Sequence, residues 1–294
     1  MVVCLPILTQ PGVIKKALQA GKHVFSEKPI AGDVATAQEL VDWHASLARA
    51  PLWGVAENFR FVKGLVAAAD KVKEIGGDLV GFHLVQATLI AENNPFWLVD
   101  CTLRSSSPSV RSTGMLMRNR TGRKVPKYQG GFLLDGGIHN IAGLRLLLTA
   151  AGQEVAQVSC VSSLLKERLL PVDTVRAVAK ATNGAGGIIT MSYGTDFKNV
   201  TEIEVITTNG RVTWTPGGGV QAVWISDSGM RQEDSLGIEM DHGVLAEFEA
   251  FAESVETRAL NPRQSPEEGL KDLRLLEALL RSGEEEAAVK KVGR

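Results

Sequence analysis

The sequence lacks an excess of charge of either sign, which limits the partners that the protein can bind. Its 294 residues carry 32 lysines and arginines against 33 aspartates and glutamates, a formal net charge of −1. Nucleic acids and anionic membranes are bound through broad basic surfaces, and this balance gives no sign of one. We therefore expect neither a nucleic acid nor a membrane as a partner.

Cysteines and long apolar runs are also scarce. The three cysteines, Cys4, Cys101 and Cys160, are scattered and form neither a disulfide framework nor a metal-binding cluster. No apolar run approaches the roughly 18 to 20 residues that span a bilayer. The apolar start, residues 1–8, lacks the basic region and cleavage site of a signal peptide, and we interpret it as a buried strand. A cytoplasmic location is expected.

Strand-like and helix-like segments alternate at the start of the chain. Apolar runs at residues 2–8, 23–25 and 53–57 predict three strands, and helices are expected between them, the second beginning after Asp33. Strand, helix, strand, helix, strand is the order of a parallel, doubly wound sheet. Residues 1–60 are therefore predicted to form an α/β domain of the Rossmann type, which binds dinucleotides.

This predicted domain lacks the glycine-rich turn, G-x-G-x-x-G, that binds pyrophosphate after the first strand of such sheets. We therefore expect an incomplete cofactor site, with two or three βα units of roughly 25 to 30 residues each lacking before Met1. Two interpretations stay open. Met1 is an internal methionine of a longer gene product, or the gene encodes a shortened form, active or inactive.

Residues 61–294 follow a different pattern. Two Asn-Gly pairs, Asn183-Gly184 and Asn209-Gly210, join short strand-like segments and predict β-hairpins. The second domain is therefore predicted to be α+β, one large, mostly antiparallel sheet with helices on one face. The expected strands lie near residues 79–90, 155–163, 173–181, 187–193, 201–208, 211–215 and 220–226, and the expected helices near 61–75, 138–150, 243–257 and from Ser265 onward.

Residues 98–122 interrupt this pattern with a serine run and several arginines. The segment is interpreted either as a mobile basic loop near the mouth of the active site or as sequence outside the folded protein. Long loops without secondary structure are uncommon in compact domains, which favours the second interpretation.

Two motifs carry residues suited to catalysis. Glu27-Lys28-Pro29 ends a strand of the parallel sheet, at the carboxyl edge where such sheets bind ligands; the alternative is a solvated lysine before a strand-ending proline. Asp135 and His139 are four residues apart and share one face of a predicted helix. The imidazole can accept a proton near neutral pH, and a carboxylate beside it can orient the ring. The alternative is a helix-capping aspartate and a packed histidine.

These motifs together resemble the glucose-fructose oxidoreductase and inositol dehydrogenase family (Gfo/Idh/MocA). The resemblance covers nearly the whole chain. It rests on Gly-Lys-His-Val-Phe-Ser-Glu-Lys-Pro at 21–29, Ala-Glu-Asn-Phe-Arg at 56–60, Gly-Gly-x-x-x-Asp-x-Gly-x-His at 130–139 and Ser-Pro-Glu-Glu-Gly-Leu-Lys-Asp-Leu at 265–273.

The resemblance implies an NAD(P)-dependent oxidoreductase that moves hydride between nicotinamide and a hydroxylated small molecule, a sugar, a polyol or a derivative of either. It implies that His139 takes the proton of the substrate hydroxyl, that Asp135 orients the imidazole, and that Lys28 stabilises the charge on the oxygen. The expected cofactor contacts are Glu27, Lys28, Pro29, Asn58 and Arg60. NAD and NADP are not distinguished.

Two alternatives remain beside the enzyme. The chain can be a non-catalytic binding or regulatory protein on the same fold, because fold alone does not fix function. It can also be a dimerisation module, since the large sheet offers a surface for a homo-oligomer. No metal is expected, because the other histidines show no ligand spacing: His23, His44, His83 and His242.

Overall fold

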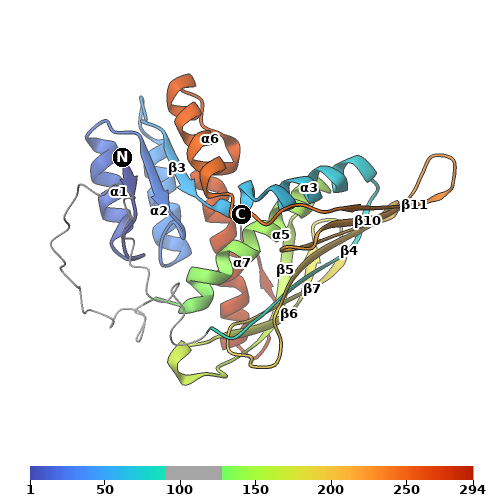
Figure 1. Cartoon of the computed structure of the whole chain (residues 1–294). Helices are drawn as coiled ribbons and strands as arrows, with labels where there is room; N and C mark the ends of the chain where they lie inside the picture. The colour runs from blue at the N-terminus through green and yellow to red at the C-terminus, as the bar shows by residue number, and fades with distance from the viewer. Residues whose placement is uncertain (91–127, 294) are drawn as a thin grey trace, which may run out of the picture.

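The computed structural model describes residues 1–90 and 128–293, which form a small parallel sheet and a large mixed sheet with helices (Figure 1). The predicted fold class is confirmed. The expectation for residues 98–122 falls outside the described residues. None of the described helices is long and apolar enough to cross a bilayer.

The small sheet has the order β1-β2-β3, and both neighbouring pairs are parallel. Its strands are β1 (Val2–Val3), β2 (Val24–Glu27) and β3 (Trp53–Ala56), with helices α1 (Gln10–Gln19) and α2 (Val34–Ala45) between them. As predicted, α2 begins after Asp33, whose carboxylate accepts a hydrogen bond from the Thr36 amide at 2.8 Å. The first strand is shorter than the predicted run 2–8, because the Pro6 carbonyl already accepts the amides of Thr9 and Gln10 in a turn.

A helix follows β3 near residues 61–75, as predicted, and a short helix that was not predicted precedes it. A 3-10 helix, η1 (Asn58–Phe61), comes first, and α3 (Lys63–Ile75) follows. Val62 between them has extended backbone angles, φ −60° and ψ 121°. The Asp241 carboxylate accepts a hydrogen bond from the Lys63 amide at 3.0 Å, so the start of α3 is capped from a distant part of the chain.

The large sheet has the order β11-β10-β9-β8-β4-β7-β6-β5-β12. The β4 and β7 strands pair in parallel, and the other neighbours are antiparallel, so the prediction of a mostly antiparallel sheet is confirmed. The strands are β4 (Leu79–Ala87), β5 (Val155–Ser163), β6 (Thr174–Ala181), β7 (Gly186–Ser192), β8 (Val200–Thr207), β9 (Gly210–Thr215), β10 (Gly219–Ile225), β11 (Arg231–Leu236) and β12 (Lys290–Lys291). The last two were not predicted: β11 is polar and mostly exposed, and β12 has only two residues.

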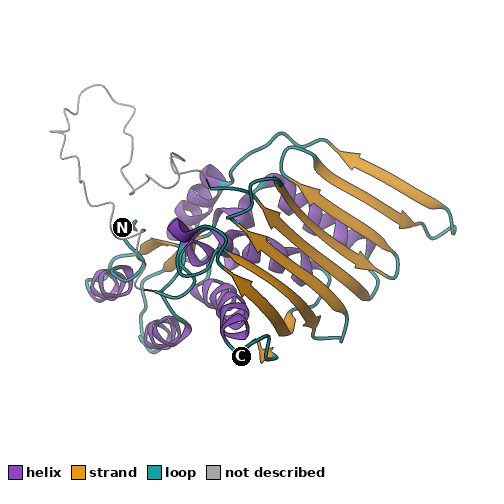
Figure 2. Cartoon of the chain, turned by 90° about the horizontal axis from the view of Figure 1, so that it is seen from below, coloured by secondary structure: helices purple, strands orange, loops and turns teal. Residues whose placement is uncertain are grey.

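Helices cover one face of this sheet, as predicted (Figure 2). They include α5 (Ile138–Ala150) and α7 (Pro266–Glu284). The α7 helix begins at the predicted cap, where the Ser265 hydroxyl accepts a hydrogen bond from the Glu268 amide at 3.2 Å. Its buried leucines continue the main hydrophobic core, which therefore also joins the large sheet to the small one.

The remaining long helix, α6 (Val244–Thr257), packs on the small sheet. Its Phe251 ring stacks on Phe25 of β2 with 4.7 Å between centroids. Gly54 of β3 makes this approach possible, since a Cβ atom there would lie 2.7 Å from the Phe251 ring. Burial of an aromatic side chain contributes about 1.5–3 kcal/mol, so this contact holds α6 against β2 and β3.

Candidate active site

The first pair of the site is an ion pair that joins the end of β2 to the turn directly before α5. Lys28 follows β2 directly, and the peptide bond between it and Pro29 is cis. Its ammonium group donates hydrogen bonds to Oδ1 and to the backbone oxygen of Asp135, both at 2.8 Å. Lys28 and Asp135, predicted from separate motifs, thus meet in one ion pair.

Asp135 lies in a π-helical turn, η3 (Leu133–Gly137), that runs directly into α5. Two glycines before this turn have backbone conformations that other residues rarely adopt. Gly130 and Gly131 have φ values of +74° and +50°. A Cβ atom on Gly131 would also lie 2.5 Å from the Leu170 carbonyl oxygen. These glycines therefore let the backbone before Asp135 pack closely against the neighbouring chain.

The second pair, between an imidazole and a carboxylate, joins the end of β3 to α5. His139 Nδ1 lies 2.7 Å from Oε1 of Glu57, the residue after β3. The Phe59 ring stacks on the imidazole with 5.1 Å between centroids. Glu57 is thus the partner of Nδ1, whereas Oδ1 of Asp135 binds Lys28. The role of Asp135 in orienting the imidazole stays a prediction.

Neighbouring groups set the protonation states of Glu57 and Lys28. Burial acts to raise the pKa of Glu57, but His139 and Arg60 outweigh it, so the pKa lies below its ordinary value. Burial acts to lower the pKa of Lys28, but the Asp135 carboxylate outweighs it, so the pKa lies above its ordinary value. At neutral pH Glu57 is therefore a carboxylate and Lys28 an ammonium ion.

Exposure separates the groups that can touch a ligand from those that cannot. The side chains of Lys28 and Asp135 are 14% and 19% exposed, and that of His139 is 22% exposed, whereas Glu57 is 1% exposed. Lys28, Asp135 and His139 can therefore meet a bound molecule directly. Glu57 acts on such a molecule only through His139.

Two of the predicted cofactor contacts, Glu27 and Pro29, are the sequence neighbours of Lys28 at the end of β2. Burial raises the pKa of Glu27 at the end of β2, and the groups that also act on this carboxyl include Lys28, His139, Glu57 and Asp135. Glu27 therefore lies close enough to both pairs for their charges to affect its ionisation. Pro29 is buried beside them and its carbonyl accepts a hydrogen bond from Gln10 Nε2 at 3.4 Å.

Asn58 and Arg60 are bound within the protein. Asn58 Nδ2 donates to the His242 carbonyl at 2.7 Å. The guanidinium of Arg60, which is 3% exposed, pairs with Asp272 of α7, and Arg145 of α5 donates to the same carboxylate at 2.5 Å. These contacts show Arg60 joining η1, α5 and α7, and its role as a cofactor contact stays a prediction.

Glu57 was missed as a functional residue, although its motif was recognised. The available signal was its position: it follows β3 just as Lys28 follows β2, and carboxyl ends of neighbouring parallel strands meet at one sheet edge. A pairing with His139, 82 residues later, has no local signature in the sequence.

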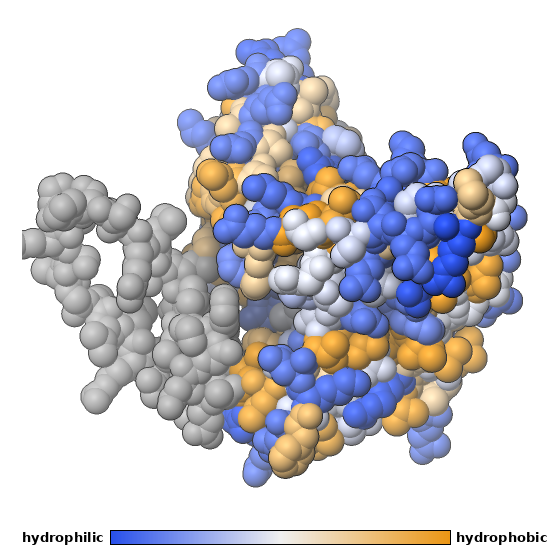
Figure 3. All heavy atoms as spheres, turned by 45° about the vertical axis from the view of Figure 1, so that its right-hand side comes forward, coloured by the Kyte–Doolittle hydropathy of each residue, from blue (hydrophilic) through white to orange (hydrophobic). Residues whose placement is uncertain are grey.

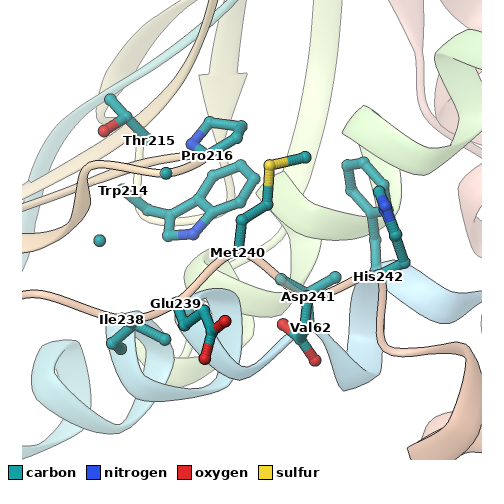
Figure 4. Close-up of a pocket in the computed structure, with 13 residues that line it drawn as sticks. Val62, Trp214, Thr215, Pro216, Ile238, Glu239, Met240, Asp241 and His242 are labelled. Carbon is teal, nitrogen blue, oxygen red and sulfur yellow. The ribbon is translucent and has the colours of Figure 1, made fainter.

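A pocket of about 90 Å³ opens on the other side of Phe59, between the start of α3 and the β9–β10 turn. Figure 4 shows the Met240 side chain extending between Trp214 and His242. The Phe59 ring lies edge-on to Trp214, with 6.4 Å between centroids. Phe59 therefore separates this pocket from His139. Among the described residues, no group of three or more possible metal ligands is found there or elsewhere.

Models of one protein family match both parts of the chain. A model described as the C-terminal alpha/beta domain of an oxidoreductase family (GFO_IDH_MocA) matches residues 110–291, and one described as its NAD-binding Rossmann fold matches residues 1–50. The chain belongs to the Gfo/Idh/MocA oxidoreductase family. This confirms the predicted resemblance and the class of enzyme.

The sequences of two relatives match most of the chain. A protein named dehydrogenase FPY6 from Fusarium mangiferae is 44% identical over 289 residues, which are 98% of this chain and 76% of the relative. An uncharacterized protein of Saccharomyces cerevisiae is 30% identical over 263 residues, 85% of this chain and 66% of the relative.

Solved structures agree with the fold. An oxidoreductase from Thermotoga maritima is 28% identical with a TM-score of 0.77, over 99% of this chain and 77% of that one. An aldose-aldose oxidoreductase from Caulobacter crescentus, crystallised with glycerol, is 21% identical with a TM-score of 0.73, over 99% of this chain and 78% of that one. At that identity the second likeness concerns the fold alone.

Proposed function

We propose that the protein is an NAD(P)-dependent oxidoreductase that transfers hydride between nicotinamide and a hydroxylated small molecule, a sugar, a polyol or a derivative. The observation that carries the proposal is the meeting of two pairs, the Lys28–Asp135 ion pair and the hydrogen-bonded His139–Glu57 pair, at the carboxyl ends of β2 and β3. Parallel sheets of this kind bind their ligands at that edge.

The residues at this edge fit the nicotinamide half of a dinucleotide. Glu27, Lys28 and Pro29 end β2, and three parallel strands with their helices correspond to one mononucleotide-binding half of a doubly wound fold. When bound, nicotinamide accepts or supplies the hydride. The proposal covers both NAD and NADP.

His139 is the proposed base. Because the Glu57 carboxylate can only accept hydrogen bonds, we assign the imidazole proton to Nδ1, which leaves a lone pair on Nε2. Nε2 can then take the proton of a substrate hydroxyl, and Glu57 stabilises the imidazolium ion that forms. In the reverse direction the imidazolium returns this proton to the product oxygen.

Lys28 is the proposed donor to the reacting oxygen. An ammonium group has three donors, and the two 2.8 Å contacts with Asp135 use two of them. Its raised pKa keeps it charged, so it stabilises negative charge on an oxygen rather than acting as a base. Asp135 holds the ammonium group in place, because it accepts hydrogen bonds through both a side-chain and a backbone oxygen.

The proposal is tested by following nicotinamide absorbance with a panel of sugars and polyols, with NAD(H) and NADP(H) in turn. Replacement of a general base lowers turnover by about 10²- to 10⁴-fold, which is the loss expected for His139→Ala. His83→Ala is the matched control, because His83 lies in β4 of the large sheet and pairs with Glu204. It should retain full activity.

Two outcomes would contradict the proposal. If His139→Ala turned over the substrate as fast as the wild-type chain, the imidazole would not be the base. If the chain bound a sugar or polyol but never changed the redox state of either cofactor, a non-catalytic binding protein would be the better account.

A second function, self-association, is favoured by the exposed face of the large sheet. Val178 of β6 and Ile188 of β7 are 66% and 49% exposed and lie directly opposite each other in the sheet. Apolar spheres also lie among hydrophilic ones over the surface drawn in Figure 3. Light scattering after size exclusion tests this proposal: a dimer that Val178→Lys makes monomeric would support it, and a wild-type monomer would contradict it.

A further inference from the structure

Behind the His139–Glu57 pair, four buried polar atoms have no hydrogen-bond partner in the described part of the chain. They are Oε2 of Glu57, Nη1 of Arg60, Oε2 of Glu247 and Oε1 of Gln264. The four residues are between 0% and 4% exposed. Glu247 lies in the first turn of α6, and Gln264 lies in the 3-10 helix η5 (Pro262–Gln264). None of the proposed catalytic steps uses either residue.

The residues that carry these atoms lie in elements that contact one another. Gln264 Nε2 donates to the Glu247 carbonyl at 2.7 Å, which joins η5 to α6. Arg263 Nη1 donates to the Arg60 carbonyl at 3.1 Å, which joins η5 to η1. The charged groups that act on the Glu247 carboxyl lie at the ends of β2 and β3 and in η1: Glu57, Glu27, Arg60 and Lys28.

Buried polar atoms nearly always have a partner, and a buried water typically binds two to four of them. We propose that buried water joins the Glu247 carboxyl group to Oε2 of Glu57, and that Glu247 is a positioning residue that controls how strongly Glu57 holds the His139 imidazole. The proposal concerns the site of the proposed function and therefore rests on it.

Glu247 is suited to this role in its neutral form. Burial raises its pKa to about 9, and the carboxylates of Glu57 and Glu27 act in the same direction. A neutral carboxyl group donates one hydrogen bond, whereas a carboxylate donates none. Below this pKa, Glu247 therefore supplies a donor to the water, and the water supplies a donor to Oε2 of Glu57.

The consequence reaches His139 through Glu57. With donors on both carboxylate oxygens, the negative charge of Glu57 is shared between the water and the imidazole. Without the donor from Glu247, more of the charge falls on Oε1, which meets the His139 ring at 2.7 Å and accepts the Phe59 amide at 3.1 Å, and this favours the imidazolium form of the ring. Glu247 thus keeps His139 a weaker base than Glu57 alone would make it.

The test is a pH titration of the whole chain carrying ¹⁵N-labelled histidine, followed by NMR without cofactor or substrate. The His139 signal is identified by its loss in His139→Gln. The Glu247→Leu variant removes the donor and should raise the midpoint of the His139 titration by about one pH unit, a tenfold gain in proton affinity. Glu247→Gln keeps a donor and should leave the midpoint within a few tenths of a unit, about the resolution of the measurement.

A second signature does not depend on the leucine variant folding. In the wild-type chain, ionisation of Glu247 should move the His139 signal again near pH 9, the pKa of this carboxyl. Glu247→Gln should abolish this second movement. The control is Glu249→Leu on the exposed face of the same helix, which should reproduce both wild-type movements.

The proposal is overturned if Glu247→Leu folds and leaves the His139 midpoint unchanged, or if the movement near pH 9 persists in Glu247→Gln. Because no cofactor or substrate is present, these results are independent of hydride transfer. A chain without oxidoreductase activity could still show both signatures, and an active chain could lack them, so the two proposals fail separately.

Discussion

The buried carboxylate of Asp272 is expected to be among the most sensitive positions in the molecule. It is the shared partner of Arg60 in η1 and Arg145 in α5, and all three residues are at most 6% exposed. Asp272→Ala would leave two buried guanidinium groups without this counter-charge. Removal of one partner from a buried ion pair costs about 3–5 kcal/mol, a large part of the roughly 5–15 kcal/mol that stabilises a folded protein.

The loss is measured by urea unfolding followed by circular dichroism. Glu268 of α7 also binds Arg145, at 2.9 Å, so we expect a loss of about 3 kcal/mol, near the lower end of that range. The control is Asp42→Ala, an exposed aspartate of α2, which should change the free energy of unfolding by less than about 0.5 kcal/mol. If the two variants were equally stable, the ion-pair network would not be what joins η1 to α5 and α7.

Three further predictions concern the site and its surroundings. The pKa of Glu247 is raised from 4.5 to about 9, so the stability this carboxyl contributes below pH 4.5 is lost as the pH rises toward 9. Urea unfolding at pH 5 and pH 8 should show a fall of up to about 1.4 kcal/mol per pH unit that Glu247→Gln removes, and parallel curves would contradict this. Glu57→Gln should lower turnover by about 10- to 100-fold without unfolding the chain, and unchanged kcat would show that Glu57 does not set the His139 tautomer. Phe251→Ala should cost about 3–5 kcal/mol in urea unfolding, and a loss below about 1 kcal/mol would mean that α6 does not depend on its stacking against Phe25.

Much of the fold could be predicted because its signals are local. The caps at Asp33 and Ser265 and the two Asn-Gly turns each act within a few residues, and the structure has a helix or hairpin at every one of them. The strands β11 and β12 could not be predicted in this way. Their sequences carry no apolar alternation, and they form only because the edges of the large sheet offer partners.

The site was predictable in part for the same reason. Lys28, Asp135 and His139 stand in recognisable motifs, and the structure brings all three into one electrostatic neighbourhood. The pairing between them was not predictable, because it depends on the π-helical turn at Leu133–Gly137 and on how β2 and β3 meet α5. Glu57 and Glu247 acquire their roles only through burial and contacts distant in sequence, which no local pattern records.

The central claim is tested most directly by cofactor binding at Lys28. Calorimetry with NADH and NADPH should give saturable binding to the chain, and Lys28→Ala should weaken it by about tenfold, the loss expected for one charge-assisted hydrogen bond. Lys22→Ala, at an exposed position before β2, is the control and should bind as the wild-type chain does. Equal binding by Lys28→Ala and the wild-type chain would contradict the assignment of this edge as the nicotinamide site.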